Sequence, residues 1–184
     1  MKPFFQFWLE NLFQNVYIAE TASLIGNVTI SDGVSIFDSA VLRGDQDSIF
    51  VGEDSNIQDN ASIHSEINSP TRIGKMVSIG HNAVVHGSTI HDNVIIGMGS
   101  IVLTGAEIES GTVIGAGAVV KERFHSSPKS LLLGIPAREV RVGEEYLNYA
   151  IANAESYIYL RERYVKKEID IIHGYDLKKN RKEF

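Results

Sequence analysis

An aliphatic residue recurs at every sixth position over most of this chain, and this short period constrains the fold more than any other feature. The residue four places later is usually small or β-branched, as at Ala40, Ala61 and Ala83. This pattern predicts a parallel β-helix, in which three short strands form one triangular coil and successive coils stack roughly 4.8 Å apart. We call the aliphatic positions heads; they are Ile18, Leu24, Ile30, Ile36, Leu42, Val51, Ile57, Ile63, Ile73, Ile79, Val85, Ile90, Ile96, Val102, Ile108, Ile114 and Val120.

The repeat divides the chain into three parts. Residues 1–15 are expected to form an apolar arm, residues 16–122 the β-helix, and residues 123–184 a loop, a helix and a basic tail. The loop is predicted from Lys121 to Val142 and the helix from about Glu144 to about Lys167, where apolar residues follow helical spacing. The sequence thus predicts an all-β solenoid with a C-terminal α-helix packed along it.

Composition narrows the classes of partner. The 184 residues are 43% hydrophobic and 22% charged, which suits one domain with a substantial core. The net charge of −6 argues against nucleic acid and anionic membranes as partners. No cysteine is present, so histidine and carboxylate are the plausible metal ligands, and a cytoplasmic location is expected. The apolar run 4–13 is interrupted by Gln6, Glu10 and Asn11 and lacks a cleavage pattern, so we do not interpret it as a signal peptide.

The repeat is interrupted three times, and each interruption adjoins a candidate functional residue. Val51 lies nine positions after Leu42, Ile73 lies ten positions after Ile63, and Ile90 lies five positions after Val85. In a solenoid, additional residues are expected to leave the coil as loops at a corner, often on the binding side. These loops would lie beside the motif at residues 43–45, beside His64 and beside His86.

The repeat also predicts which polar side chains lie together. Arg43, His64 and His86 each follow a head, and three repeats, which make one complete coil, separate each from the next. These three residues should therefore form one column on one face, a strand spacing apart. Asp59 and His81 each lie two places after a head, also one coil apart, and should form a second column on the adjacent face.

The two columns suggest a metal site shared between chains. One side of the triangle is about 20 Å long if extended, whereas zinc needs its nitrogen ligands within about 2.1 Å. His81 therefore cannot easily join His64 and His86 in one chain. If identical chains pack side by side, His81 of one can meet the histidine pair of the next, and a cyclic trimer closes this contact. Three histidines with an open fourth position are typical of catalytic zinc. His91, His125 and His173 are interpreted as surface residues or hydrogen-bond partners.

Several motifs together resemble the γ-class carbonic anhydrases and carbonic anhydrase-like hexapeptide proteins, from about residue 16 to the terminal helix. They are Val41-Leu42-Arg43-Gly44-Asp45, Asn56-Ile57-Gln58-Asp59-Asn60, His64, Ile79-Gly80-His81-Asn82-Ala83-Val84-Val85-His86-Gly87, Ile96-Gly97-Met98-Gly99-Ser100 and Gly134-Ile135-Pro136-Ala137.

This resemblance implies a left-handed parallel β-helix, assembled as a homotrimer with a metal at each subunit interface. It implies that His64 and His86 of one chain and His81 of its neighbour bind the metal. The usual metal is Zn²⁺, with Fe²⁺ or Co²⁺ as alternatives. The implied reaction is the reversible hydration of carbon dioxide to bicarbonate, in which the metal lowers the pKa of bound water to about 7 and so supplies hydroxide.

The resemblance also implies roles for residues around the metal. Arg43 and Asp45 match residues that form an intersubunit salt bridge behind the site. Gln58 matches a residue that positions the metal-bound solvent, and Asp59 matches a further polar group that would orient His81.

The chain departs from the family pattern where proton transfer is concerned. Gln46 stands where active relatives carry a glutamate, and the loop after His64 is reduced to residues 65–70, with Glu66 as its acid. Tyr157, Tyr159 and Tyr164 either reach the site from the helix or pack on the core. Two alternatives therefore stay open beside the carbonic anhydrase: a metal-binding trimer with little catalysis, and a coenzyme A-dependent acyltransferase, since hexapeptide β-helices also carry that activity.

Overall fold

The computed structural model describes residues 15–173, which form seventeen strands and one helix. The elements are β1 (Tyr17–Ile18), β2 (Ser23–Ile30), β3 (Ser35–Ile36), β4 (Val41–Val51), β5 (Asn56–Ile57), β6 (Ser62–His64), β7 (Thr71–Ile73), β8 (Ser78–Ile79), β9 (Val84–His86), β10 (Thr89–Ile90), β11 (Ile95–Ile96), β12 (Ile101–Val102), β13 (Glu107–Ile108), β14 (Val113–Ile114), β15 (Val119–Val120), β16 (Ser130–Gly134), β17 (Ala137–Val142) and α1 (Glu144–Val165). The predicted all-β solenoid with a C-terminal helix is confirmed.

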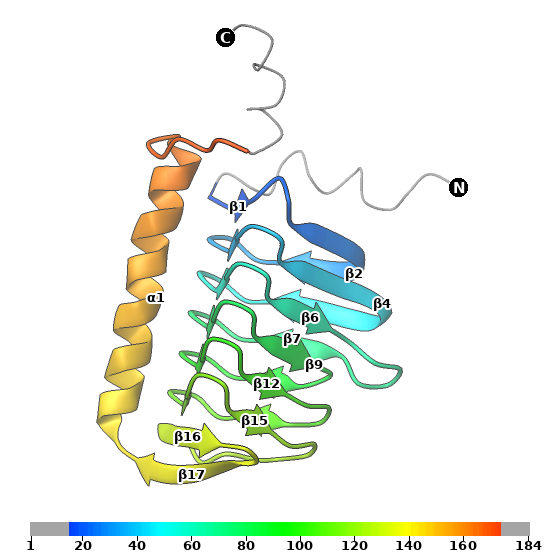
Figure 1. Cartoon of the computed structure of the whole chain (residues 1–184), viewed down its shortest axis with the longest axis vertical. Helices are drawn as coiled ribbons and strands as arrows, with labels where there is room; N and C mark the ends of the chain where they lie inside the picture. Colours follow the sequence, from blue (N-terminus) through cyan, green and yellow to red (C-terminus); the bar gives the residue numbers. More distant parts are fainter. Residues whose placement is uncertain (1–14, 174–184) are drawn as a thin grey trace, which may run out of the picture.

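The strands stack in parallel along the long axis of the molecule (Figure 1). One sheet has the order β1-β3-β5-β8-β11-β14-β16-β17, and this is the sheet that α1 contacts. The other two sides form one continuous sheet, β13-β10-β7-β4-β6-β9-β12-β15, with β2 paired to β4. These sides are joined because β4 is long enough to turn the corner, pairing with β6 through its first residues and with β7 through its last.

The heads form the core of the solenoid. Ile36 pairs in register with Ile57, Ile57 with Ile79, Ile79 with Ile96, and Ile96 with Ile114, and all five are fully buried. Each buried aliphatic side chain contributes roughly 1.5–3 kcal/mol relative to an exposed one. The stacked heads thus hold every coil in the same register, which places the residues between heads on defined faces.

Two backbone requirements recur at the corner that follows the helix-covered sheet. The residue three places after each head adopts a left-handed conformation; the residues are Ser39, Asn60, Asn82, Gly99 and Gly117, with φ between 58° and 69°. In the later coils, the residue one place after the head is a glycine, and at Gly80 and Gly97 the backbone of the next coil approaches closely. At Gly97 an added Cβ would lie 2.5 Å from the Ile114 carbonyl oxygen and 2.6 Å from the Ala116 nitrogen. In the Gly97-Met98-Gly99 motif, the first glycine leaves room for the backbone of the next coil, and the second adopts the positive φ that the corner requires.

The structure corrects two sequence-based predictions. The interruption from Leu42 to Val51 is not a loop, because its residues continue as strand β4, which pairs with β2 across a register shift between Gly26 and Val28. The segment from Lys121 to Val142 is not wholly a loop either. Its strand β16 pairs in parallel with β14, and β17 returns antiparallel to β16. The solenoid sheet therefore extends beyond residue 122. The second interruption does form a loop, closed by a bridge between Glu66 and Ser69.

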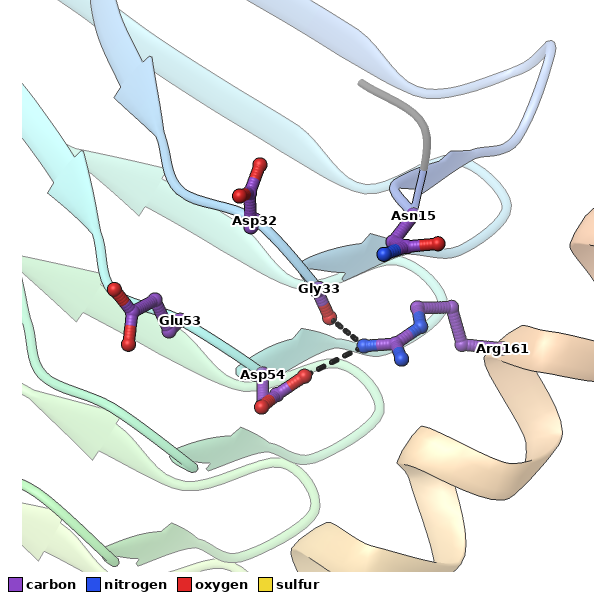
Figure 2. A pocket seen from close by; sticks show the side chains of 6 residues that line it. All are labelled: Asn15, Asp32, Gly33, Glu53, Asp54 and Arg161. Carbon is purple, nitrogen blue, oxygen red and sulfur yellow. Dashed lines mark hydrogen bonds and ion pairs between the residues drawn. The ribbon is translucent and has the colours of Figure 1, made fainter. Parts of the chain in front are cut away.

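Helix α1 begins at Glu144, as predicted, and runs back along the solenoid from β17 toward β1 (Figure 1). Near its end, the buried Arg161 donates from Nη1 to the Gly33 carbonyl oxygen at 2.5 Å and pairs with Asp54 Oδ1 at 2.7 Å. These groups line a polar pocket of about 250 Å³ together with Asn15, Asp32 and Glu53 (Figure 2). A charge-assisted hydrogen bond buried in this way ties the helix to the first coils.

Tyrosines of α1 pack against the solenoid. The ring of Tyr164 stacks on Tyr17 with centroids 4.5 Å apart, and Tyr157 contacts Phe37 edge-on at 5.8 Å. Burial raises the pKa of Tyr17 to about 12. Tyr159, by contrast, is exposed. Packing is therefore the role that the structure gives to Tyr157 and Tyr164.

Within residues 15–173, no helix is long and apolar enough to cross a membrane. The predicted apolar arm falls almost wholly outside the described residues, and the basic residues of the tail lie outside them.

Candidate metal centre

The first predicted column is present. Arg43 of β4 pairs in register with His64 of β6, and His64 pairs with His86 of β9. The two imidazole rings tilt toward each other, with His64 Nδ1 only 3.0 Å from His86 Nε2. Both side chains are partly buried. The strand register thus brings together two nitrogens that could bind one metal ion.

The outer nitrogen of His64 is held by a carboxylate. His64 Nε2 lies 3.1 Å from Asp45 Oδ1, and Arg43 Nη1 lies 2.8 Å from Asp45 Oδ2. The hydrogen bond from Arg43 lowers the pKa of the Asp45 carboxyl, with a further contribution from His64. Because an ionised carboxylate only accepts hydrogen bonds, the contact with Asp45 favours a proton on His64 Nε2 and leaves Nδ1 to face His86.

The outer nitrogen of His86 is held by a hydroxyl. His86 Nδ1 lies 2.9 Å from Thr104 Oγ1, which in turn donates to Glu66 Oε2 at 3.2 Å. Since the single hydroxyl proton goes to Glu66, Thr104 accepts the proton of His86 Nδ1. This contact favours a proton on His86 Nδ1 and leaves Nε2 to face His64.

The second predicted column holds His81. Its Nδ1 lies 2.7 Å from Asp59 Oδ2, so Nε2 is the nitrogen left for a ligand. The buried Gln58 accepts a hydrogen bond from the His81 backbone N–H through Oε1 and donates through Nε2 to Asn56 Oδ1 at 2.9 Å. Gln58 and Asp59 thus fix the backbone and the ring of His81.

The pair of facing nitrogens requires a cation. Two unprotonated nitrogens 3.0 Å apart repel each other unless a proton or a metal ion lies between them. Zinc, with bonds of about 2.1 Å, holds two tetrahedral ligands about 3.4 Å apart, so a small movement of the rings would accommodate it. An oxygen partner on the second nitrogen of each histidine is also typical of metal ligands in proteins. The donor set therefore fits a divalent metal ion.

The structure does not bring His81 to the histidine pair. Among residues 15–173, the three histidines do not form a group whose ligand atoms lie within 4.8 Å of one another. His81 follows β8 in the helix-covered sheet, whereas His64 and His86 end strands of the other sheet. This separation agrees with the prediction that a site with all three needs a second chain.

Sequence reasoning missed the residues that orient the histidines from other columns. Thr104 holds His86, Thr71 Oγ1 donates to the His64 carbonyl oxygen, and Asn56 holds Gln58. The repeat assigns a face to each of these residues, but only the side-chain geometry shows that they meet the site. Gln46 is exposed on β4, where a carboxylic acid would also reach solvent.

Comparisons with known proteins agree with the fold and the motifs. Residues 87–122 match the family described as "Bacterial transferase hexapeptide (six repeats)". A "Probable carbonic anhydrase" of Methanocaldococcus jannaschii is 46% identical over 150 residues, which cover 81% of this chain and 94% of that protein. "Gamma carbonic anhydrase 2, mitochondrial" of Arabidopsis thaliana is 38% identical over 156 residues, covering 81% of this chain.

The matched region is 56% of the Arabidopsis protein, so the chain corresponds to little more than half of that relative. Among solved structures, a hexapeptide transferase family protein from Anaplasma phagocytophilum superimposes with a TM-score of 0.78 at 40% identity, covering 82% of this chain and 89% of that one. The identity and coverage of these relatives show that the chain belongs to the family of γ-class carbonic anhydrases and related hexapeptide-repeat proteins.

Proposed function

We propose that the chain is a metal-dependent carbonic anhydrase that reversibly hydrates carbon dioxide at a site shared by two subunits of a homotrimer. His64 and His86 of one subunit and His81 of the next would bind the metal, with zinc as the expected ion and Fe²⁺ or Co²⁺ as alternatives. The observation that carries this proposal is the 3.0 Å separation of His64 Nδ1 and His86 Nε2, two histidines whose other ring nitrogens each have an oxygen partner.

When bound, a divalent metal lowers the pKa of a water molecule to about 7 and provides the nucleophile for carbon dioxide. The residues of the chain would supply orientation. Asp45 and Thr104 hold the two rings so that unprotonated nitrogens face the site. Gln58 uses one amide hydrogen on Asn56 and retains a second one, which would orient the reacting water.

The proposal is tested by measuring metal content and catalysis on the same sample. Protein prepared without chelators should contain metal, and stopped-flow assays should show carbon dioxide hydration above the uncatalysed rate. Removing the metal by dialysis against a chelator should abolish hydration, and adding Zn²⁺ should restore it. A chain without bound metal would refute the site. A metal-loaded chain with only the background rate would refute the catalytic function while leaving the site intact.

Thr104→Val should weaken the site while preserving the fold. The substitution keeps the shape of the side chain but leaves His86 Nδ1 without its acceptor and breaks the link to Glu66. Loss of such an orienting partner typically reduces metal affinity or activity by about 10- to 100-fold. Competition with a fluorescent zinc chelator would measure the affinity. Thr29→Val, at an exposed position of β2, serves as the control, and an equal affinity in both variants would contradict the role of Thr104.

Gln46 favours a second candidate function, a metal-binding trimer with slow hydration. Glutamine cannot transfer a proton, and regeneration of the nucleophile requires proton export to solvent. Glu66 is the acid connected to the site, through Thr104 and His86. If Glu66 lies close enough to the reacting water to accept its proton, the chain would be a fast carbonic anhydrase. If Glu66 lies too far away, hydration would be slow.

An acyltransferase is the third candidate function, because the matched family model and the superimposed Anaplasma protein carry transferase names. Such an enzyme would need one histidine as a base, whereas here two histidines, His64 and His86, face each other with ring nitrogens 3.0 Å apart. The donor set therefore favours metal binding over acyl transfer.

A further inference from the structure

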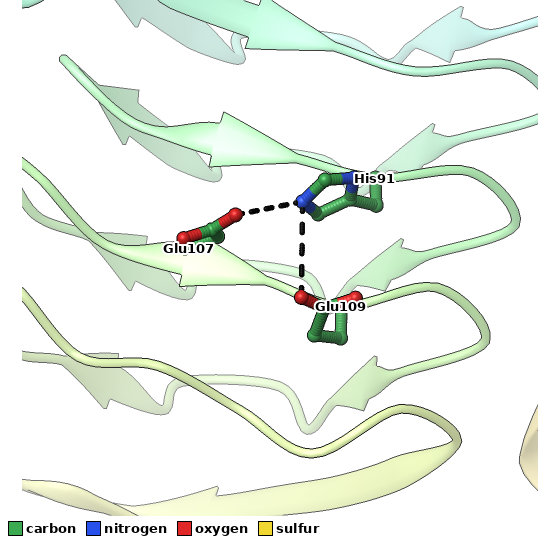
Figure 3. A group of neighbouring side chains, drawn as sticks. All are labelled: His91, Glu107 and Glu109. Carbon is green, nitrogen blue, oxygen red and sulfur yellow. Dashed lines mark hydrogen bonds and ion pairs between the residues drawn. The ribbon is translucent and has the colours of Figure 1, made fainter.

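A second group of potential metal ligands lies on the face that carries β10 and β13. His91 directly follows the buried head Ile90, while Glu107 and Glu109 flank the buried head Ile108. Ile90 and Ile108 pair in register, so the three side chains point outward from adjacent strands. Figure 3 shows the imidazole of His91 above both carboxylates, with Nε2 directed at each.

The distances within this group suit a small cation. His91 Nε2 lies 3.1 Å from Glu107 Oε1 and 4.0 Å from Glu109 Oε1, and the three ligand atoms all lie within 4.8 Å of one another. A zinc ion with bonds of about 2.1 Å places its ligands about 3.4 Å apart in a tetrahedron. The three side chains are partly exposed, so their ends can adjust to this spacing.

The charges of the group also favour a cation. Within residues 15–173, both glutamates form ion pairs with histidines only, and neither pairs with a lysine or arginine. His125 contacts both carboxylates, with Nδ1 3.2 Å from Glu107 and Nε2 3.5 Å from Glu109. The two carboxylates carry a charge of about −2 at neutral pH, which a divalent ion would balance.

We propose that His91, Glu107 and Glu109 form a second metal site, which takes a divalent ion of the zinc type. Imidazole and carboxylate ligands suit such ions, and three protein ligands leave one position for water or for His125. The site is separate from the histidine pair, because β7 and β4 lie between β10 and β6 in the sheet. It lies within one chain and therefore does not depend on the trimer.

A metal ion here would link two consecutive coils. His91 belongs to the strand pair β7–β10 and the glutamates to the next coil, at β13. An ion that binds only the folded arrangement stabilises the fold in proportion to its occupancy. The function that we assign to this site is therefore structural, and loss of the site should leave the chemistry at the other centre unchanged.

The test is elemental analysis of chains equilibrated with Zn²⁺ and freed of excess by gel filtration. The wild type should retain about two ions per chain, and His91→Ala and Glu109→Gln should each retain about one fewer. Glu155→Gln, on the exposed side of α1, is the matched control and should retain the wild-type content. Hydration activity should stay within about twofold of wild type in both site variants, since neither contacts the histidine pair.

Two further outcomes separate this proposal from the first site. The His81→Ala variant should retain only the ion bound by His91, Glu107 and Glu109, and the double variant His81→Ala/His91→Ala should retain none. This result is expected whether or not the wild type also binds metal at the interface site. Equal zinc content in wild type, His91→Ala and Glu109→Gln would overturn the second site. Thermal unfolding with and without Zn²⁺ provides an independent reading, because only chains with His91 and Glu109 intact should be stabilised by zinc in the His81→Ala background.

Discussion

His81→Ala is expected to eliminate metal from the proposed interface site and to reduce carbon dioxide hydration to the uncatalysed rate. The substitution removes one of three protein ligands, and the remaining pair, His64 and His86, comes from a different face of the solenoid. His81 lies at a partly exposed corner after β8, so its removal should leave the stacked core intact. Circular dichroism would confirm the fold, and metal analysis and stopped-flow assays would measure the loss.

Mixing two inactive variants tests whether the site is shared between chains. In a trimer of His81→Ala and His64→Ala chains, an interface is complete wherever the intact histidine pair of one variant meets the intact His81 of the other. Random assembly of equal amounts makes about a quarter of the interfaces complete. Co-refolded mixtures should therefore regain about a quarter of the wild-type activity. Mixtures as inactive as the separate variants, despite demonstrated mixed assembly, would contradict a site built from two subunits.

Among the single substitutions considered, Gly97→Ala is expected to reduce the free energy of unfolding the most. The new Cβ would lie 2.5 Å from the Ile114 carbonyl oxygen, which accepts the Gly97 N–H, and 2.6 Å from the Ala116 nitrogen. These atoms belong to the backbone of the next coil and cannot rotate away. Overpacking of this kind costs about 1–3 kcal/mol, and here we expect the upper part of that range. Urea unfolding at fixed chain concentration would measure it.

Gly99→Asn is the matched control for Gly97→Ala. Gly99 has a φ of +64°, with open space where its Cβ would be. Asn82 occupies the equivalent position one coil earlier with a φ of 58°, and asparagine tolerates this conformation. The control should change the free energy of unfolding by less than about 0.5 kcal/mol. A loss as large as that of Gly97→Ala would show that the corner backbone, and not the close approach, limits stability.

Most of the fold could be predicted because a period of six specifies which side chains stack. The loop predicted from Lys121 to Val142 was wrong because the repeat continues there without an aliphatic head at every sixth position. Ser126 and Leu132 continue the spacing from Val120, but the buried serine hides the coil that leads to β16. The segment from Leu42 to Val51 continues as a strand because β2 pairs with both of its ends, residues 41–44 and 49–51, a pairing that side-chain patterns do not reveal.

The sequence predicts which residues of the candidate site lie in the same column, but it does not predict their side-chain hydrogen bonds. Register alone places His64 above His86 and Asp59 beside His81. The partners Thr104 and Asn56 depend on side-chain conformations across neighbouring faces, which a repeat cannot specify. The same limit applies to His91 and His125, which the sequence suggests are separate surface residues although the structure gathers them with Glu107 and Glu109.

The antiparallel return of β17 against β16 has a consequence for how copies of this protein associate. A stack of parallel strands ends in a row of unpaired backbone groups, onto which another solenoid could add and begin a fibre. In the helix-covered sheet, β17 pairs with β16 and forms the last strand, where it presents the exposed charges of Arg138, Glu139 and Arg141. Charged edge strands disfavour the addition of another sheet, so this edge disfavours growth along the axis and leaves the sides of the solenoid for the proposed trimer.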